Sequence, residues 1–174
     1  MTEDAASSPD GAVVFTDLVG FTEFTAFHGD REALALLDRQ DRIVRDALPD
    51  DARVVKNLGD GMMLWFPDAV RAVESCLRLA ARFEDDESAD VPLWVRIGVH
   101  WGCPTRRGDD LVGHDVNLAA RIMEVAGPGE VLVSEPARER VDRRIDGLHL
   151  EELGPVVMKG IPDPVPLYRA TRVA

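Results

Sequence analysis

The apolar and polar positions of the chain follow two periods, one typical of strands and one typical of helices. Short runs rich in β-branched and aromatic residues predict strands, and longer stretches with apolar residues three or four positions apart predict amphipathic helices. The predicted strands are Ala12–Asp17, Arg53–Leu58, Met62–Phe66, Leu93–Trp101, one within Gly127–Glu135, Leu148–Leu153 and Val165–Thr171. The predicted helices are a short one after Gly20, then Asp30–Leu48, Asp68–Phe83, Val116–Val125 and Pro136–Val141.

The order of these elements predicts an α+β fold. Only Gly59-Asp60-Gly61 separates the strands Arg53–Leu58 and Met62–Phe66, so these strands form a hairpin. A direct hairpin among alternating strands and helices favours a mixed or antiparallel sheet with helices packed on it, built on a ferredoxin-like core. We expect residues 12–174 to be a single domain and the acidic, polar residues 1–11 to be a flexible tail.

Composition narrows the choice of partners. The formal net charge of −12 argues against nucleic acid and against an anionic membrane as partners. No apolar run approaches the roughly 18 residues that a membrane-spanning helix needs. Two cysteines, Cys76 and Cys103, provide no disulfide framework, and the first residues do not resemble a signal peptide. We therefore expect a reduced, cytoplasmic protein.

Two aspartates stand at positions that a sheet would bring together. Asp17 ends the first predicted strand, and Asp60 lies in the hairpin turn. Two neighbouring carboxylates repel each other unless a cation or a proton lies between them, and Mg²⁺ binds carboxylates together with phosphate oxygens. The N–H groups of Phe21 and Thr22, at the start of the short helix, are placed to meet a phosphate. The alternative is that Asp17 caps the helix and Asp60 serves only the turn.

A second polar group lies on a predicted helix. Asn117 and Arg121 are four residues apart, so they share one helix face, and an amide beside a guanidinium suits an oxyanion. The alternative is an ordinary surface pair. Lys56, four residues before Asp60, and Lys159 are the two lysines of the chain, whereas arginine is common.

Taken in order, these segments resemble the class III nucleotide cyclase catalytic domain, the adenylyl and guanylyl cyclase family. The similar segments are VVFTDLVGFT, VVKNLGDGMMLWF, VRIGVHWG, DLVGHDVNLAAR, PGEVLVSE and VVMKGIPDPVPLY. They span about residues 12–172, and six segments in the family order are far more specific than any one of them. Only the seven residues CPTRRGD separate Gly102 from Asp110, which resembles the compact bacterial subgroup. His114 stands where the family often has aspartate, and we interpret it as a turn variant.

The resemblance implies a metal and phosphate site. Asp17 and Asp60 would hold two divalent cations, Mg²⁺ or Mn²⁺, with help from the carbonyl of Leu18. Arg96 and Lys159 match family positions that contact the terminal phosphates of the substrate.

The resemblance also implies a reaction and a substrate. Lys56 and Asp110 would read the base, Asn117 would orient the ribose, and Arg121 would stabilise the α-phosphate. The reaction is attack of the ribose 3′-oxygen on the α-phosphorus of ATP, which releases pyrophosphate and forms 3′,5′-cyclic AMP. A lysine that donates and an aspartate that accepts complement N1 and N6 of adenine, so ATP is favoured over GTP. The family shares its sites between two catalytic domains, which implies a head-to-tail homodimer.

Two other interpretations remain. A diguanylate cyclase has a related fold, but its Gly-Gly-Asp/Glu-Glu-Phe turn is absent, since the turn here is Leu58-Gly59-Asp60-Gly61. A cyclase-like module that only binds a nucleotide or a partner is the alternative from another functional class, because a fold alone does not guarantee activity.

Overall fold

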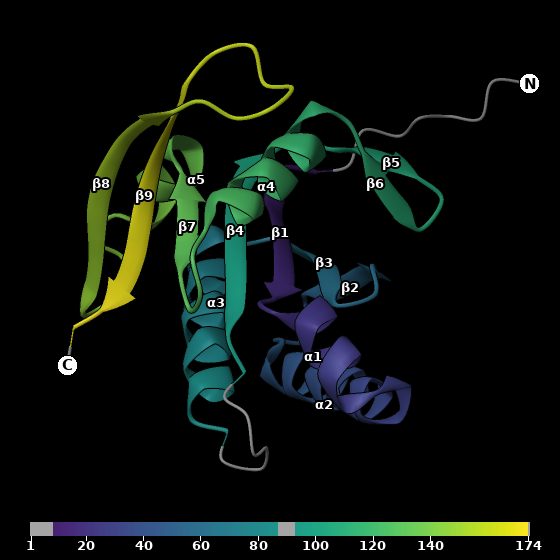
Figure 1. The fold of residues 1–174 in the computed structure, drawn as a ribbon. Coiled ribbons are helices and arrows are strands. Elements are labelled where there is room, and N and C mark those ends of the chain that lie inside the picture. The colour runs from purple at the N-terminus through teal and green to yellow at the C-terminus, as the bar shows by residue number, and fades with distance from the viewer. Residues whose placement is uncertain (1–8, 87–92, 174) are drawn as a thin grey trace, which may run out of the picture.

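The computed structural model describes residues 9–86 and 93–173, which form one main sheet with helices on both faces (Figure 1). The strands of the main sheet are β1 (Gly11–Leu18), β2 (Arg53–Asn57), β3 (Gly61–Phe66), β4 (Val95–Gly102), β7 (Val131–Ser134), β8 (Leu148–Val156) and β9 (Val165–Arg172). Their spatial order is β2-β3-β1-β4-β7-β9-β8. The helices are α1 (Phe21–His28), α2 (Asp30–Ala47), α3 (Ala69–Glu84), α4 (His114–Val125) and α5 (Glu135–Val141).

The sheet is mixed. β1 pairs antiparallel with both β3 and β4, whereas β4 and β7 run parallel. β9 pairs antiparallel with β7 and with β8. The hairpin predicted around Gly59-Asp60-Gly61 is present as β2 and β3, and it lies beside β1 as the metal-site hypothesis requires.

Helices cover the two faces of the sheet unequally. The alternate side chains Ala12, Val14 and Leu18 of β1 belong to a large core with α2, α3 and α5. The intervening side chains Val13 and Phe15 pack instead with residues of α4. Figure 1 shows α4 in front of the sheet and α3 behind it. One strand therefore separates two cores, as the two-residue period of a strand requires.

The contact between α4 and β4 depends on a glycine. A Cβ atom built on Gly98 would lie 2.3 Å from the backbone nitrogen of Met123, so the helix approaches the strand more closely than any side chain at this position would allow. The last turn of α4 is thereby held directly on β4.

The structure corrects several element boundaries. Gly11 belongs to β1 and not to the predicted tail, and β4 begins at Val95, two residues after Leu93. A short hairpin of β5 (Thr105–Arg107) and β6 (Asp110–Val112) was not predicted, because strands of three residues carry too little pattern. Residues 1–8 of the predicted tail lie outside the described residues.

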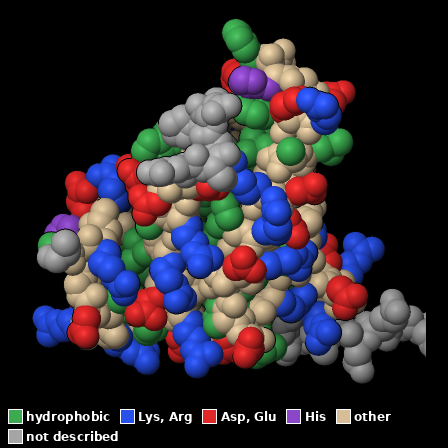
Figure 2. All heavy atoms as spheres, turned by 90° about the horizontal axis from the view of Figure 1, so that it is seen from below, with side chains coloured by type: hydrophobic (Ala, Val, Ile, Leu, Met, Phe, Trp, Pro, Cys, Tyr) green, Lys and Arg blue, Asp and Glu red, His purple; other side chains and the backbone are tan. Residues whose placement is uncertain are grey.

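Two surface properties bear on partners. Within the described residues, no helix combines the length and the apolar character needed to cross a lipid bilayer. Figure 2 shows basic and acidic side chains interspersed over the face that it presents. That face therefore carries no large patch of a single sign.

Candidate active site

The turn between β2 and β3 brings Asp60 to the end of β1, where Asp17 lies. Asp17 pairs with Gly61 across the β1–β3 ladder, and the backbone N–H of Leu18 donates to the carbonyl of Asp60 at 3.0 Å. Gly59 has a φ of 79°, which suits the first position of a two-residue hairpin turn. The predicted meeting of Asp17 and Asp60 at one edge is therefore present in the structure.

Arg96 on β4 neutralises Asp17. Its Nε and Nη2 donate to Oδ2 of Asp17 at 3.0 and 2.8 Å. Partial burial raises the pKa of the Asp17 carboxyl, the hydrogen bonds from Arg96 oppose this rise, and the negative charge of Asp60 adds to it. Two carboxylates that repel each other beside one guanidinium form a site that attracts further positive charge.

A small cavity lies beside this carboxylate pair. It has a volume of about 250 Å³, and its lining includes Asp17, Gly20 and Arg96. α1 begins at Phe21 after Gly20, with no side-chain cap, so the alternative that Asp17 caps this helix is wrong. The first N–H groups of α1, on Phe21 and Thr22, are left without a capping side chain.

The carboxylate pair has the chemistry of a site for hard cations. Asp17, Asp60 and the backbone carbonyl of Leu18 supply oxygen donors, which Mg²⁺ and Mn²⁺ prefer. Among the described residues, no cluster of three or more His, Cys, Asp or Glu side chains is arranged to hold a metal. The remaining ligands would be water and the phosphates of a nucleotide, which is the usual situation for Mg²⁺.

Lys56 and Asp110, predicted to read the base, form an ion pair. Nζ of Lys56 donates to Oδ2 of Asp110 at 2.8 Å, although the two residues are 54 positions apart. This hydrogen bond, more than any other interaction, holds the pKa of the Asp110 carboxyl below its usual value. Arg53 also donates to the carbonyl of Asp109 at 3.0 Å, so the β5–β6 hairpin is tied to β2.

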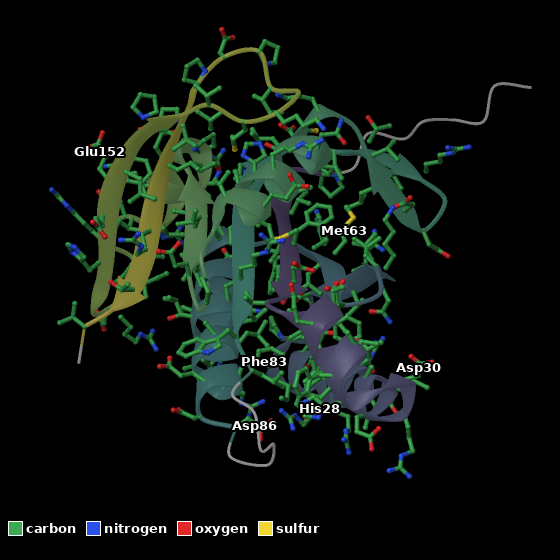
Figure 3. All side chains as sticks on the ribbon, in the orientation of Figure 1. His28, Asp30, Met63, Phe83, Asp86 and Glu152 are labelled. Atoms are coloured by element: carbon green, nitrogen blue, oxygen red, sulfur yellow. The ribbon has the colours of Figure 1, made fainter. Side chains whose placement is uncertain are left out.

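The strand register places these groups on the face of the sheet that carries α4. Lys56 pairs with Met63, and Met63 pairs with Phe15, two residues before Asp17. Cross-strand neighbours point to the same face. Met63 is fully buried in the core under α4 and β6 (Figure 3).

Asn117 and Arg121 lie on α4, and the side chain of Asn117 is exposed. Nη1 of Arg121 donates to the carboxylate of Glu124 at 2.7 Å. Within residues 9–86 and 93–173, no hydrogen bond or ion pair joins Asn117, Arg121 or Lys56 to the carboxylates of Asp17 and Asp60. The two sets of predicted site residues therefore make no direct contact of this kind in the described part of one chain, although Arg96, which binds Asp17, also donates to the carbonyl of Glu124 at 3.1 Å.

Lys159 lies on a different segment from the other predicted site residues. Its side chain is exposed in the segment between β8 and β9. In Figure 1 this segment passes over the top of the molecule near α4, whereas β1 ends toward the bottom near α1. No hydrogen bond or ion pair among the described residues joins Lys159 to Asp17 or Arg96, so its role stays a prediction.

Comparison with known protein families shows to which family the chain belongs. Residues 4–169 match the family described as the adenylate and guanylate cyclase catalytic domain. The chain belongs to this family. It is 34% identical over 164 residues to the pH-sensitive adenylate cyclase of Mycobacterium tuberculosis (strain CDC 1551 / Oshkosh), which covers 93% of this chain and 41% of that protein. It is 36% identical over 122 residues to an adenylate cyclase of Streptomyces griseus, which covers 70% of this chain and 30% of the relative. The cyclase domain thus spans less than half the length of these relatives.

Solved structures confirm the fold of the cyclase domain. The adenylyl cyclase CyaB from P. aeruginosa has a TM-score of 0.80 at 23% identity, with 95% of each chain covered. An adenylate cyclase from Trypanosoma brucei, described in its monomeric state, has a TM-score of 0.82 at 24% identity and covers 98% of this chain and 93% of its own. The predicted α+β class and the resemblance to class III cyclases are both confirmed.

A buried histidine on β4 is hydrogen-bonded to the first turn of α4. His100 on β4 is 4% exposed, with Nδ1 2.8 Å from Oγ of Ser134 and Nε2 2.9 Å from Oδ1 of Asp115. Burial lowers the pKa of His100, and the hydrogen bond with Asp115 opposes this effect. Ser134 is fully buried, so this Ser-His-Asp set has no access to a substrate. His100 is therefore a structural residue.

Proposed function

We propose that this chain is an adenylyl cyclase domain that converts ATP to 3′,5′-cyclic AMP and pyrophosphate. The observation that carries the proposal is the meeting of Asp17 and Asp60 beside Arg96 and the uncapped start of α1. Membership of the cyclase family supports nucleotide cyclisation as the reaction, and relatives named adenylate cyclase favour ATP.

The proposed metal site uses Asp17, Asp60 and the carbonyl of Leu18. When bound, two divalent cations would activate the ribose 3′-hydroxyl and offset the negative charge of the triphosphate. Arg96 lies beside Asp17, where its guanidinium would bind the terminal phosphates. The N–H groups of Phe21 and Thr22 would donate to the same phosphates.

The second group of residues would act on the rest of the nucleotide. The amide of Asn117 would orient the ribose so that its 3′-oxygen faces the α-phosphorus. The guanidinium of Arg121 would donate to the α-phosphate oxygens, where negative charge grows in the transition state. Both residues lie on α4, a rigid helix held to the sheet at Gly98 and His100.

Lys56 and Asp110 would select adenine. Lys56 donates toward N1 and Asp110 accepts from the N6 amine, whereas guanine presents the opposite order of donor and acceptor. The ion pair between them shows that both side chains reach one point on the surface. Their mutual hydrogen bond would be exchanged for two hydrogen bonds to the base.

We further propose that the two groups meet across a head-to-tail homodimer. Asp17 and Asp60 of one copy would face Lys56, Asp110, Asn117 and Arg121 of a second copy. The proposal is supported by membership of the cyclase family, which shares its sites between two catalytic domains. Such a dimer would have two equivalent sites, and a single chain would be inactive.

Product identification tests the proposed reaction directly. The purified protein is incubated with ATP or GTP, each with Mn²⁺ or Mg²⁺, and the products are separated by chromatography. We expect cyclic AMP and pyrophosphate from ATP and little cyclic GMP, with Asp60→Asn as the inactive control. A dimeric protein that binds ATP and forms no product would instead support the nucleotide-binding module. Predominant cyclic GMP would contradict the proposed choice of adenine.

A further inference from the structure

One buried polar side chain outside the predicted site contacts the turn that carries Asp60. Gln40 on α2 is 1% exposed, and it belongs to the buried stripe of this helix with Ala33, Leu36 and Val44. Its Nε2 donates to the backbone carbonyl of Asp60 at 2.9 Å, across 20 positions of sequence. Burial of a side-chain amide costs free energy unless the amide is hydrogen-bonded. The hydrogen bond to Asp60 therefore offsets the cost of burying Gln40 among apolar residues.

The carbonyl that Gln40 contacts also joins the two carboxylate positions. It accepts the N–H of Leu18, the residue directly after Asp17, at 3.0 Å. One oxygen atom therefore ties the end of β1, the β2–β3 turn and α2 together. The hydrogen bond from Gln40 goes to the main chain, so it constrains where the Asp60 side chain starts and does not use its carboxylate.

The space behind the turn is not filled by packing. A cavity of about 790 Å³ lies between α2 and the hairpin, and its lining includes Gln40, Asn57, Gly59 and Met62. Met62, directly after the turn, belongs to the same buried core as Leu36 and Val44 of α2. The hydrogen bond from Gln40 fixes the main chain of the turn itself against this helix.

We propose that Gln40 is a positioning residue that sets the separation between the Asp60 and Asp17 carboxylates for divalent cations. This inference rests on the metal site of the proposed function. The turn itself closes without Gln40, because Leu58 donates to the carbonyl of Gly61 at 2.8 Å. Loss of the Gln40 donor would therefore leave a folded hairpin whose carboxylate is less well placed. Substitutions that loosen the support of metal ligands weaken metal binding by about 10–100-fold.

The test compares two substitutions on the same face of α2. Gln40→Met keeps the length of the side chain and removes the donor, and Val44→Ala is the matched control because Val44 is fully buried one turn away. Mn²⁺ binding is measured by electron paramagnetic resonance on the full protein with 3′-deoxy-ATP, which has no 3′-hydroxyl to react. Thermal unfolding is measured on the same samples.

We expect Gln40→Met to weaken Mn²⁺ binding about tenfold or more, whereas Val44→Ala lowers the melting temperature and leaves Mn²⁺ affinity unchanged. In kinetics, Gln40→Met should raise the Mn²⁺ concentration for half-maximal rate while the KM for ATP at saturating Mn²⁺ changes little. Equal Mn²⁺ affinity of wild type and Gln40→Met would overturn the proposal, whatever happens to stability.

Two further measurements keep the result interpretable. Asp60→Asn tests the metal site itself: if wild type binds Mn²⁺ no better than Asp60→Asn, both the metal site and the role of Gln40 are overturned. If Gln40→Met does not fold, the side-chain amide of Gln40 is followed by nuclear magnetic resonance in wild type during titration with Mg²⁺ and 3′-deoxy-ATP. A resonance that shifts with Mg²⁺ supports the proposal, and one that stays fixed overturns it.

Discussion

The Lys56–Asp110 pair shows how single residues carry specificity without carrying much stability. Their side chains are 41% and 37% exposed, and an ion pair in such a position contributes only about 0–1 kcal/mol to folding. The pairing of β2 with β3 shifts register between Val54 and Lys56, and the lysine after this shift contacts Asp110 of the β5–β6 hairpin. The ion pair therefore breaks at little cost in free energy. This suits two side chains that would each give up their mutual hydrogen bond to bind a base.

Reversal of this pair should reverse the choice of base. The double substitution Lys56→Glu/Asp110→Lys keeps opposite charges at the same two positions, so the free energy of unfolding should change by less than about 0.5 kcal/mol. The donor and acceptor then face guanine, and kcat/KM for ATP should fall by about 100-fold or more while turnover of GTP rises. Kinetics with both nucleotides measure the change.

The matched control for this reversal is another exposed ion pair. Arg71 and Asp51 are 2.8 Å apart and neither is a predicted site residue, so Arg71→Asp/Asp51→Arg should leave both activities unchanged. Full retention of ATP selectivity after reversal of Lys56 and Asp110 would show that other residues read the base.

Helix α4 is the element on which the proposed chemistry depends most. It carries Asn117 and Arg121, and its first turn is fixed by the hydrogen bond from His100 to Asp115. Asp115 also accepts the N–H of Cys103 at 2.9 Å, so the same carboxylate holds the start of the β5–β6 hairpin segment. Burial opposes ionisation of Asp115, but the hydrogen bonds from His100 and from Cys103 hold the pKa of this carboxyl below its usual value.

The stability of the cyclase domain should fall when His100 titrates. Burial lowers the pKa of His100 below its ordinary value of 6.5, so the unfolded chain binds the proton first as the pH falls. The contribution of neutral His100 to the free energy of unfolding is therefore fully present above about pH 6.5. It declines as the pH drops from there toward the pKa of His100 in the folded state. Asp115 titrates in a separate and more acidic window, because its folded pKa lies below 3.8.

Urea unfolding at several pH values measures this effect. At pH 8, His100→Asn should lower the free energy of unfolding by about 1–3 kcal/mol, because buried hydrogen bonds are lost. The difference between wild type and His100→Asn should shrink as the pH falls below about 6.5. His149→Asn, at an exposed position, controls for the loss of a histidine. A difference that stays constant from pH 8 to pH 5 would contradict the role assigned to burial.

At the scale of the whole molecule, the proposed site residues divide between two regions of one chain. Asp17 and Asp60 lie at the end of β1, and Arg121 lies on α4 beside Glu124. In the proposed dimer each site takes its carboxylates from one copy and its arginine from the other. This arrangement predicts that two different inactive copies complement each other.

Mixed dimers should recover part of the activity. Asp17→Ala and Arg121→Ala should each be nearly inactive alone, and a mixture allowed to exchange subunits should form dimers with one complete site. Random exchange would restore about a quarter of the wild-type activity, since about half of the dimers are mixed and each has one of two sites. The measurement is cyclic AMP formation after unfolding and refolding of the two proteins together.

The control for complementation uses two changes that fall in the same half-site. A mixture of Asp17→Ala and Asp60→Asn should remain inactive, because every mixed dimer has a damaged carboxylate pair in both sites. Recovery in this mixture, or failure of the first mixture when dimers are shown to exchange, would count against the shared site.

The sequence by itself determined the elements that have a strong period or a defined turn. Local patterns predict the hairpin around Gly59 and Asp60, the amphipathic helices and the buried β1. A period of 2 or 3.6 residues can be recognised from residues that are close together in the sequence. The motif order around Asp17, Asp60, Lys56 and Arg121 also identified the family, which the match over residues 4–169 confirms.

Only the tertiary structure decided which residues meet across long stretches of chain. The Lys56–Asp110 pair, the guanidinium of Arg96 on Asp17 and the amide of Gln40 on Asp60 each join positions that are 20 to 79 residues apart. A buried glutamine in an apolar stripe is visible in the sequence of α2, but its partner is not. The reason is physical: such contacts depend on strand register and on helix placement, which the packing of the whole sheet sets and no local pattern records.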